Sequence, residues 1–169
     1  EIMPSLVGSE MCIRDSFNPL RERALERFAD PQSIVEMATY GSTDIASTYY
    51  QVKAGGDAAA LKGIMKALLA LDAERGDALD HDFIAQHTQG VDALVADLEA
   101  TSWADIEKHS GLPRASLEQV AEAYSRSTAA IVTYGMGITQ HNKGTANVRL
   151  IADLLLLRCL LYTSDAADE

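Results

Sequence analysis

The apolar residues between positions 57 and 76 repeat with the period of an α-helix. The residues that share one face are Leu61, Ile64, Met65, Leu68 and Leu71. This spacing predicts an amphipathic helix, and Gly76 provides a stop at its C-terminal end. The preceding Gly55-Gly56-Asp57 predicts a tight turn. Asp57 is expected to cap the helix, because a carboxylate can accept hydrogen bonds from the first free N–H groups.

Runs rich in aromatic and β-branched residues predict strands. Two such runs are residues 49–54 and 129–134, and Phe17-Asn18-Pro19-Leu20 is typical of the exit from a third strand. Short helices are predicted at residues 21–29, around residues 34–37 and in pieces from 80 to 127. After a loop at 135–144, a last helix carrying Val148, Ile151, Leu154 and Leu155 is predicted to run up to Arg158. The charges of residues 21–29 alternate in sign, as on a solvated helix face.

Strands that alternate with helices indicate an α/β layer architecture with parallel strands. In such folds ligands gather at the carboxyl ends of the strands. Both predicted strand ends inside the chain carry glycine-rich turns into helices, Gly55-Gly56-Asp57 and Gly135-Met136-Gly137-Ile138-Thr139-Gln140. Glycine lets a backbone approach a phosphate closely, and the helix start beyond it offers free N–H donors. Taken alone, each turn is more often purely structural, because no G-x-G-x-x-G or Walker pattern is present.

Composition narrows the classes of function. The chain has 169 residues, 47% of them hydrophobic and 23% charged, which is ordinary for a soluble globular domain. Its formal net charge of −11 argues against nucleic acid as a partner, because such binding depends on clustered Lys and Arg. The longest apolar run is too short to span a bilayer, and no signal peptide is visible. We therefore expect a cytoplasmic protein with no membrane span.

The two ends differ from the rest of the chain. Codons can be chosen so that Met-Cys-Ile-Arg-Asp-Ser at 11–16 and Cys-Leu-Leu-Tyr-Thr-Ser at 159–164 derive from reverse-complementary DNA. This pattern resembles read-through of a transposon-end sequencing adaptor. Residues 1–16 and 159–169 are accordingly predicted to be non-native tails around a domain fragment at 17–158. Both cysteines lie in these tails, so they support no argument for a disulfide or a metal site.

Few residues point to catalysis. The four histidines form neither an i,i+4 pair nor a cluster with cysteine, so no metal site is predicted. No G-x-S-x-G nucleophile elbow is present. The sequence therefore assigns no catalytic residue.

The most informative segment is Tyr-Gly-Met-Gly-Ile-Thr-Gln-His at 134–141, followed by Gly144 and Asn147. It resembles a segment of molybdopterin oxidoreductases, in particular the formate-dehydrogenase-like alpha subunits of the dimethyl-sulfoxide-reductase superfamily. Three further segments match that branch in the same order, at 18–21, 51–57 and 87–90. The resemblance covers essentially all of 17–158.

This resemblance implies a partial Rossmann-like α/β domain and a molybdenum (or tungsten) ion held by two molybdopterin guanine dinucleotides. The positions that match cofactor-contacting residues of the family are Met136 and Gln140, with Gly135 and Gly137 in the same turn. Those that match a nucleotide end are Gly55, Gly56 and Asp57. Asn18 takes the place of a polar residue beside the nucleotide. The family's metal-ligating Cys or selenocysteine, its catalytic His and Arg and any iron–sulfur cysteines fall outside the matched segment.

Two functions from different classes remain open at this point. In the first, the parent protein is a molybdenum oxidoreductase with a small-molecule substrate, and this segment contributes cofactor binding. In the second, the chain is a non-catalytic α/β ligand-binding or interaction module. If the strands ending at Ala54 and Tyr134 share one parallel sheet, both glycine turns should open onto one crevice. Asp57 would there either cap its helix or accept hydrogen bonds from a guanine or ribose.

Overall fold

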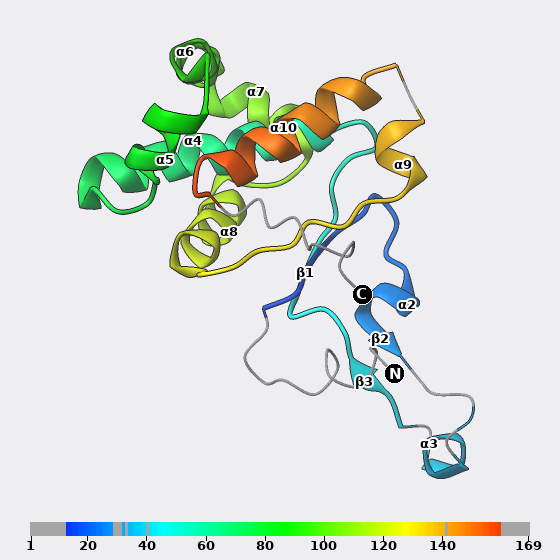
Figure 1. Cartoon of the computed structure of the whole chain (residues 1–169). Coiled ribbons are helices and arrows are strands. Elements are labelled where there is room, and N and C mark those ends of the chain that lie inside the picture. The colour runs from blue at the N-terminus through cyan, green and yellow to red at the C-terminus, as the bar shows by residue number, and fades with distance from the viewer. Residues whose placement is uncertain (1–12, 29–31, 33, 40, 141, 160–169) are drawn as a thin grey trace. The chain divides into compact units, whose positions relative to one another are not determined.

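The computed structural model describes residues 13–28, 32, 34–39, 41–140 and 142–159. It divides the chain into two compact units, Glu1–Val52 and Lys53–Glu169, which are treated separately below (Figure 1). The described part is mixed helix and sheet and mostly helical. Predictions that concern Ala29, His141 and most of the two tails fall outside the described residues.

The first unit contains a small parallel pair of strands. Strand β1 (Asp15–Phe17) pairs with β4 (Thr48–Tyr50), and the rings of Phe17 and Tyr50 stack with their centroids 4.9 Å apart. The predicted strand end at Phe17 is therefore confirmed, and so is parallel pairing. Strand β4 stops at Tyr50 rather than continuing to Ala54. Asp15 and Ser16, which the sequence assigned to the N-terminal tail, form part of β1.

The same unit holds an antiparallel pair, β2 (Arg27–Phe28) with β3 (Thr43–Asp44), and two short helices, α2 (Arg23–Glu26) and α3 (Ile34–Thr39). The helix predicted over 21–29 is thus only one turn long. It ends because the backbone of Arg27 is extended, with φ −143° and ψ 138°, and pairs with Asp44 in the neighbouring strand.

Helix α4 (Asp57–Arg75) lies at the centre of the second unit. Helices α6 (Val91–Ala100), α7 (Trp103–Ser110), α8 (Arg114–Arg126) and α10 (Gly144–Leu156) pack against it, and α5 (His81–His87) follows it along the chain (Figure 1). Met65 and Leu68 on α4 are completely buried, as are Leu98, Ile106 and Leu117 on the helices around it. The helical pattern predicted from 57 to 76 and from 80 to 127 is confirmed, and Gly76 ends α4 in the left-handed conformation.

The N-cap of α4 is Gly56 rather than Asp57, so the predicted capping role of Asp57 is wrong. The carbonyl of Gly56 accepts the first helical hydrogen bond, from the N–H of Ala60 at 3.0 Å. Asp57 is already the first residue inside the helix. Its carboxylate still lies at the positive end of the helix dipole, where a negative charge is favoured.

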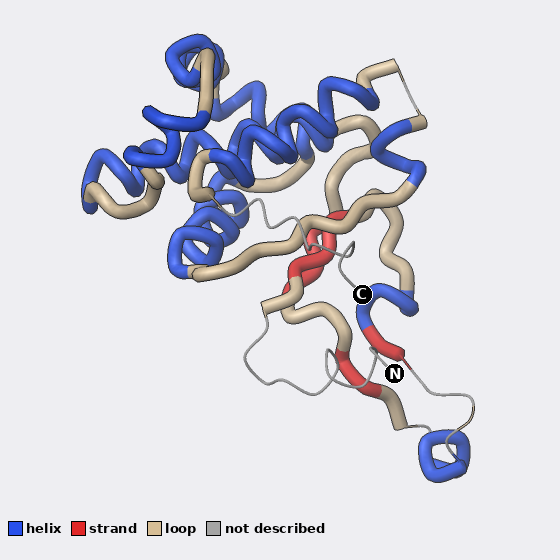
Figure 2. The backbone as a smooth tube through the Cα atoms, viewed as in Figure 1, coloured by secondary structure: helices blue, strands red, loops and turns tan. Residues whose placement is uncertain are grey.

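The strand predicted at 129–134 does not form. Residues 128–135 are irregular in the structure, and the short helix α9 (Met136–Thr139) follows them (Figure 2). No described residue provides a backbone hydrogen bond to 129–134, and Ile131 is 83% exposed. A β-prone sequence becomes a strand only when a neighbour supplies the ladder of hydrogen bonds, and the described residues supply none here.

The C-terminal end of α10 is joined by hydrogen bonds to the loop that follows α4. The N–H of Asp80 donates to the carbonyl of Leu157 at 2.9 Å, and Arg158 donates to the carbonyl of Ala78 at 2.8 Å. On the neighbouring α8, the Tyr124 hydroxyl donates to the carbonyl of Leu154 at 2.9 Å. Burial raises the pKa of Tyr124 well above its usual value, so the phenol stays protonated and keeps donating. These contacts fix the direction of α10 beside α4.

A lysine of α4 holds the end of α6. Lys66 Nζ donates to the carbonyls of Leu98, Glu99 and Thr101 at 2.8, 3.2 and 2.7 Å. These carbonyls have no partner inside α6, because the last turn of any helix leaves its acceptors unused. The lysine thus satisfies the C-terminal end of a neighbouring helix.

We expect Lys66→Met to lower the free energy of unfolding by about 2–3 kcal/mol, because a charge-assisted contact to half-buried carbonyls is lost. Lys62→Met is the matched control on the same helix. Lys62 makes only a surface ion pair with Asp97, so the control should cost less than about 1 kcal/mol. Urea denaturation of the two variants measures the difference, and equal losses would contradict the capping role of Lys66.

Candidate functional site

The turn before α4 is fixed by backbone packing. The N–H of Lys53 donates to the carbonyl of Ser110 at 2.7 Å, and the N–H of Gly56 donates to the carbonyl of Lys53 at 2.8 Å. Gly55 has a φ of +75°, a conformation that side chains rarely adopt. A Cβ on Gly56 would lie 2.5 Å from the carbonyl oxygen of His109. Gly56 is therefore required by the packing of α4 on α7, whatever else it does.

The carboxylate of Asp57 has no polar partner among the described residues. The Asp57 side chain is half-buried. Gly55, two positions before it, has open space where a side chain would stand. The turn thus offers a carboxylate that can accept two hydrogen bonds, beside a backbone that a ligand can approach closely.

The second glycine turn is exposed except at Ile138, which is half-buried. Met136 is 69% exposed, and Gln140 Nε2 lies 3.4 Å from Met136 Sδ. A Cβ on Gly135 or Gly137 would meet no atom within 4 Å. The turn packs against the start of α10 at Gly144. The backbones are so close there that a Cβ on Gly144 would lie only 2.2 Å from the carbonyl oxygen of Thr139. It presents open backbone, an apolar side chain and an amide to its surroundings.

Both glycine turns lie at the N-terminal end of the helix pair α4–α10. The hydrogen bonds of Asp80 and Arg158 bring the C-terminal ends of these helices together, and Figure 1 shows both helices running in the same direction. The turn at Gly55–Asp57 enters α4, and the turn at 135–140 enters α10 through α9. The structure therefore places the two turns toward the same end of the second unit, although no sheet edge lies beneath them in the described residues.

Asn18 lies in the first unit, directly after β1. Its N–H donates to the carbonyl of Tyr50 at 3.2 Å, and its side-chain amide donates to the carbonyl of Leu20 at 2.7 Å. The amide nitrogen thus closes the turn after β1. Its carbonyl oxygen is the part that remains for other contacts.

Two cavities in the described part of the chain have no residue of the glycine turns in their lining. One, of about 410 Å³, adjoins the C-terminal end of α4 and is lined by Asp77, Asp80, His81 and Arg158, among others. The other, of about 620 Å³, is in the first unit and is lined by Arg21, Arg23 and Arg27 with acidic neighbours. In the described part of the chain, no three His, Cys, Asp or Glu side chains gather as a metal site would require.

The arginine-lined cavity is a feature that sequence reasoning missed. The alternation of charge at 21–29 predicted a solvated helix face, whereas the helix ends at Glu26 and the chain then turns into β2. This turn brings Arg27 to the same cavity as Arg21 and Arg23. The signal that could have shown it is the density of arginine, three within seven residues of a chain whose net charge is −11.

None of the helices in the described ranges is long and apolar enough to cross a membrane. No protein-family model matches the chain.

Curated proteins give clear matches. Protein YdeP of Escherichia coli (strain K12) is 46% identical over 148 residues, which are 85% of this chain and 20% of that protein. An "Uncharacterized oxidoreductase" of Mycobacterium tuberculosis is 31% identical over 146 residues, 85% of this chain and 18% of that protein. A "Putative formate dehydrogenase" of Staphylococcus aureus is 27% identical over 136 residues, 80% of this chain and 13% of that protein.

The chain spans about a fifth of the length of the first two of these curated relatives. It is related to a segment of proteins that are named as oxidoreductases, and at lower identity to one named as a formate dehydrogenase. These names agree with the oxidoreductase part of the interpretation from sequence. They say nothing of molybdopterin.

Substitution by alanine should affect stability differently at the glycines of the two turns. Gly56→Ala should lower the free energy of unfolding by about 2 kcal/mol or more, because the new Cβ meets backbone atoms that cannot turn aside. Gly137→Ala should change it by less than about 0.5 kcal/mol, since its Cβ enters open space at an ordinary φ. Chemical denaturation measures both values, and a large loss for Gly137→Ala would mean that the second turn is packed rather than open.

Proposed function

We propose that this chain is a segment of a molybdenum oxidoreductase of the formate-dehydrogenase-like kind and that it helps to hold a molybdopterin guanine dinucleotide. The observation that carries the proposal is the pair of glycine turns at one end of the helix pair α4–α10, in a chain related to proteins named as oxidoreductases. A Rossmann-like arrangement, with residues 129–134 paired in a sheet of the parent protein, belongs to the same proposal.

The residues present fit such a group. Gly55, Gly135 and Gly137 leave open space along the backbone, as close approach of a pterin or a diphosphate requires. The carboxylate of Asp57, which has no polar partner among the described residues, suits a guanine, whose edge presents neighbouring N–H donors.

In this role, each residue contributes binding and orientation. Asp57 accepts hydrogen bonds from the guanine or the ribose, and the N–H groups at the start of α4 favour negative charge nearby. Met136 supplies apolar contact, and the Gln140 amide both donates and accepts. The carbonyl oxygen of Asn18 is the atom available in the first unit. When bound, the molybdenum (or tungsten) centre supplies two-electron redox chemistry.

No catalytic residue is assigned within this chain. Reaction with a small-molecule substrate, any iron–sulfur cluster and a cytoplasmic location are part of what we propose for the parent protein. The residues described above would act on the cofactor rather than on the substrate.

The experiment is to express the complete parent gene and measure the molybdenum content and the guanosine monophosphate released by acid from the purified protein. We expect both in the wild type, and a several-fold lower guanosine monophosphate content in Asp57→Ala and in Gln140→Ala. Arg126→Gln is the control, because Arg126 pairs with Glu122 on the exposed face of α8, away from both turns. A wild-type protein with neither molybdenum nor guanosine monophosphate would contradict the proposal and favour a non-catalytic module.

A further inference from the structure

The first unit contains a cleft of about 620 Å³ in which arginines outnumber carboxylates. Its charged lining residues are Arg21, Arg23, Arg27, Glu26 and Asp44. The chain as a whole has only 14 Lys and Arg against 25 Asp and Glu. A locally positive cleft in a strongly acidic chain therefore stands out, and its volume is in the range of small-molecule sites.

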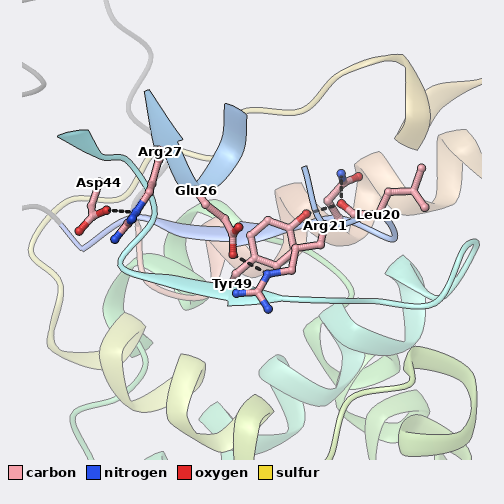
Figure 3. A network of polar contacts seen from close by, with 7 residues as sticks. Leu20, Arg21, Glu26, Arg27, Asp44 and Tyr49 are labelled. Atoms are coloured by element: carbon pink, nitrogen blue, oxygen red, sulfur yellow. Dashed lines mark hydrogen bonds and ion pairs between the residues drawn. The ribbon is translucent and has the colours of Figure 1, made fainter. Parts of the chain in front are cut away.

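Two of the arginines are oriented by carboxylates through a single nitrogen each. Arg21 Nε donates to Glu26 Oε1 at 2.6 Å, and Arg27 Nε donates to Asp44 Oδ1 at 2.7 Å (Figure 3). A guanidinium has five N–H donors in a planar fork. The terminal nitrogens of both side chains make no hydrogen bond with the described residues, so each side chain keeps four unused N–H donors.

The third arginine has no polar partner among the described residues. Arg23 begins helix α2. Its side chain makes no hydrogen bond or ion pair with the described part of the chain. Arg21 and Arg27 are already held in place, whereas Arg23 can turn toward a ligand. The two carboxylates reduce the net positive charge of the cleft, but they occupy the Nε side of their arginines and leave the terminal nitrogens open.

The backbone around the cleft is tied together. The N–H of Ile45 donates to the carbonyl of Glu26 at 2.7 Å, which joins β2 to β3 beyond their two paired residues. The hydroxyl of Tyr49 on β4 donates to the carbonyl of Leu20, and this fixes the aromatic ring at the edge of the cleft (Figure 3).

We propose that this arginine cleft binds a phosphate-bearing small molecule through the terminal nitrogens of Arg21, Arg23 and Arg27. Guanidinium forks match phosphate oxygens in pairs, and such charge-assisted hydrogen bonds are the strong ones. None of these arginines is among the residues proposed above to contact the molybdenum cofactor. The inference therefore stands independently of the proposed function.

The test is isothermal titration of the 169-residue chain with inorganic pyrophosphate at low ionic strength, where such contacts are least screened. We expect binding by the wild type, weakened about tenfold in Arg23→Gln and further in Arg21→Gln/Arg27→Gln. Arg23→Gln is the cleanest variant, because its side chain holds no other described residue in place. Circular dichroism checks that each variant keeps its helical content.

Arg126→Gln is the matched control, because it removes one positive charge from the second unit and leaves the cleft intact. It should bind pyrophosphate as the wild type does. A parallel titration with guanosine diphosphate separates two sources of the phosphate, since tighter binding than pyrophosphate identifies a nucleotide and equal binding identifies the phosphate groups alone. Absence of pyrophosphate binding, or equal weakening in Arg126→Gln, would overturn the proposal.

Discussion

The close approach of α4 to α7 and α8 at Gly63 is the contact on which the second unit depends. A Cβ at this position would lie 2.6 Å from Leu117 Cδ1 and 2.9 Å from Ile106 Cγ2. Because Gly63 has no side chain, Ile106 and Leu117 reach the surface of α4 and are almost completely buried there. Cores packed this tightly transmit any change of volume to their neighbours. The turn at Gly55–Asp57 leads directly into α4, so its position depends on this packing.

The helices could be predicted from the sequence because their signals are local. The apolar spacing from Leu61 to Leu71 and the glycine stop at Gly76 specify α4 without reference to any other part of the chain. The N-cap could not be chosen between Gly56 and Asp57, because that choice depends on how Gly56 packs against the carbonyl of His109. A single-residue shift here changes Asp57 from a capping residue into a carboxylate that has no hydrogen-bond partner among the described residues.

The conformation of residues 129–134 was predicted wrongly as a strand, for a different reason. Their composition favours a strand, but a strand exists only with a partner, and the described residues provide none. The chain spans about a fifth of the length of its relative YdeP, so that relative has much more sequence from which such a partner could come. Ile131, 83% exposed here, is the residue that such pairing would cover.

Sequence reasoning found the glycine turns of the candidate site but not the arginine cleft, and geometry explains the difference. The turns are contiguous motifs, visible as Gly55-Gly56-Asp57 and Gly135-Met136-Gly137. The cleft depends on the pairing of β2 with β3, in which Arg27 lies opposite Asp44, seventeen residues further along the chain. No local sequence pattern predicts that pairing. A site formed by the pairing of two short strands cannot be recognised from the sequence alone, because its residues come together only in the folded chain.

The central claim is that two turns some eighty residues apart contact one and the same cofactor. The most direct measurement is a crystal structure of the complete parent protein purified with its bound cofactor. We expect the Asp57 carboxylate and the Gln140 amide both to lie within hydrogen-bond distance of one molybdopterin guanine dinucleotide. A cofactor bound elsewhere, with both turns facing solvent or packed against protein, would contradict it.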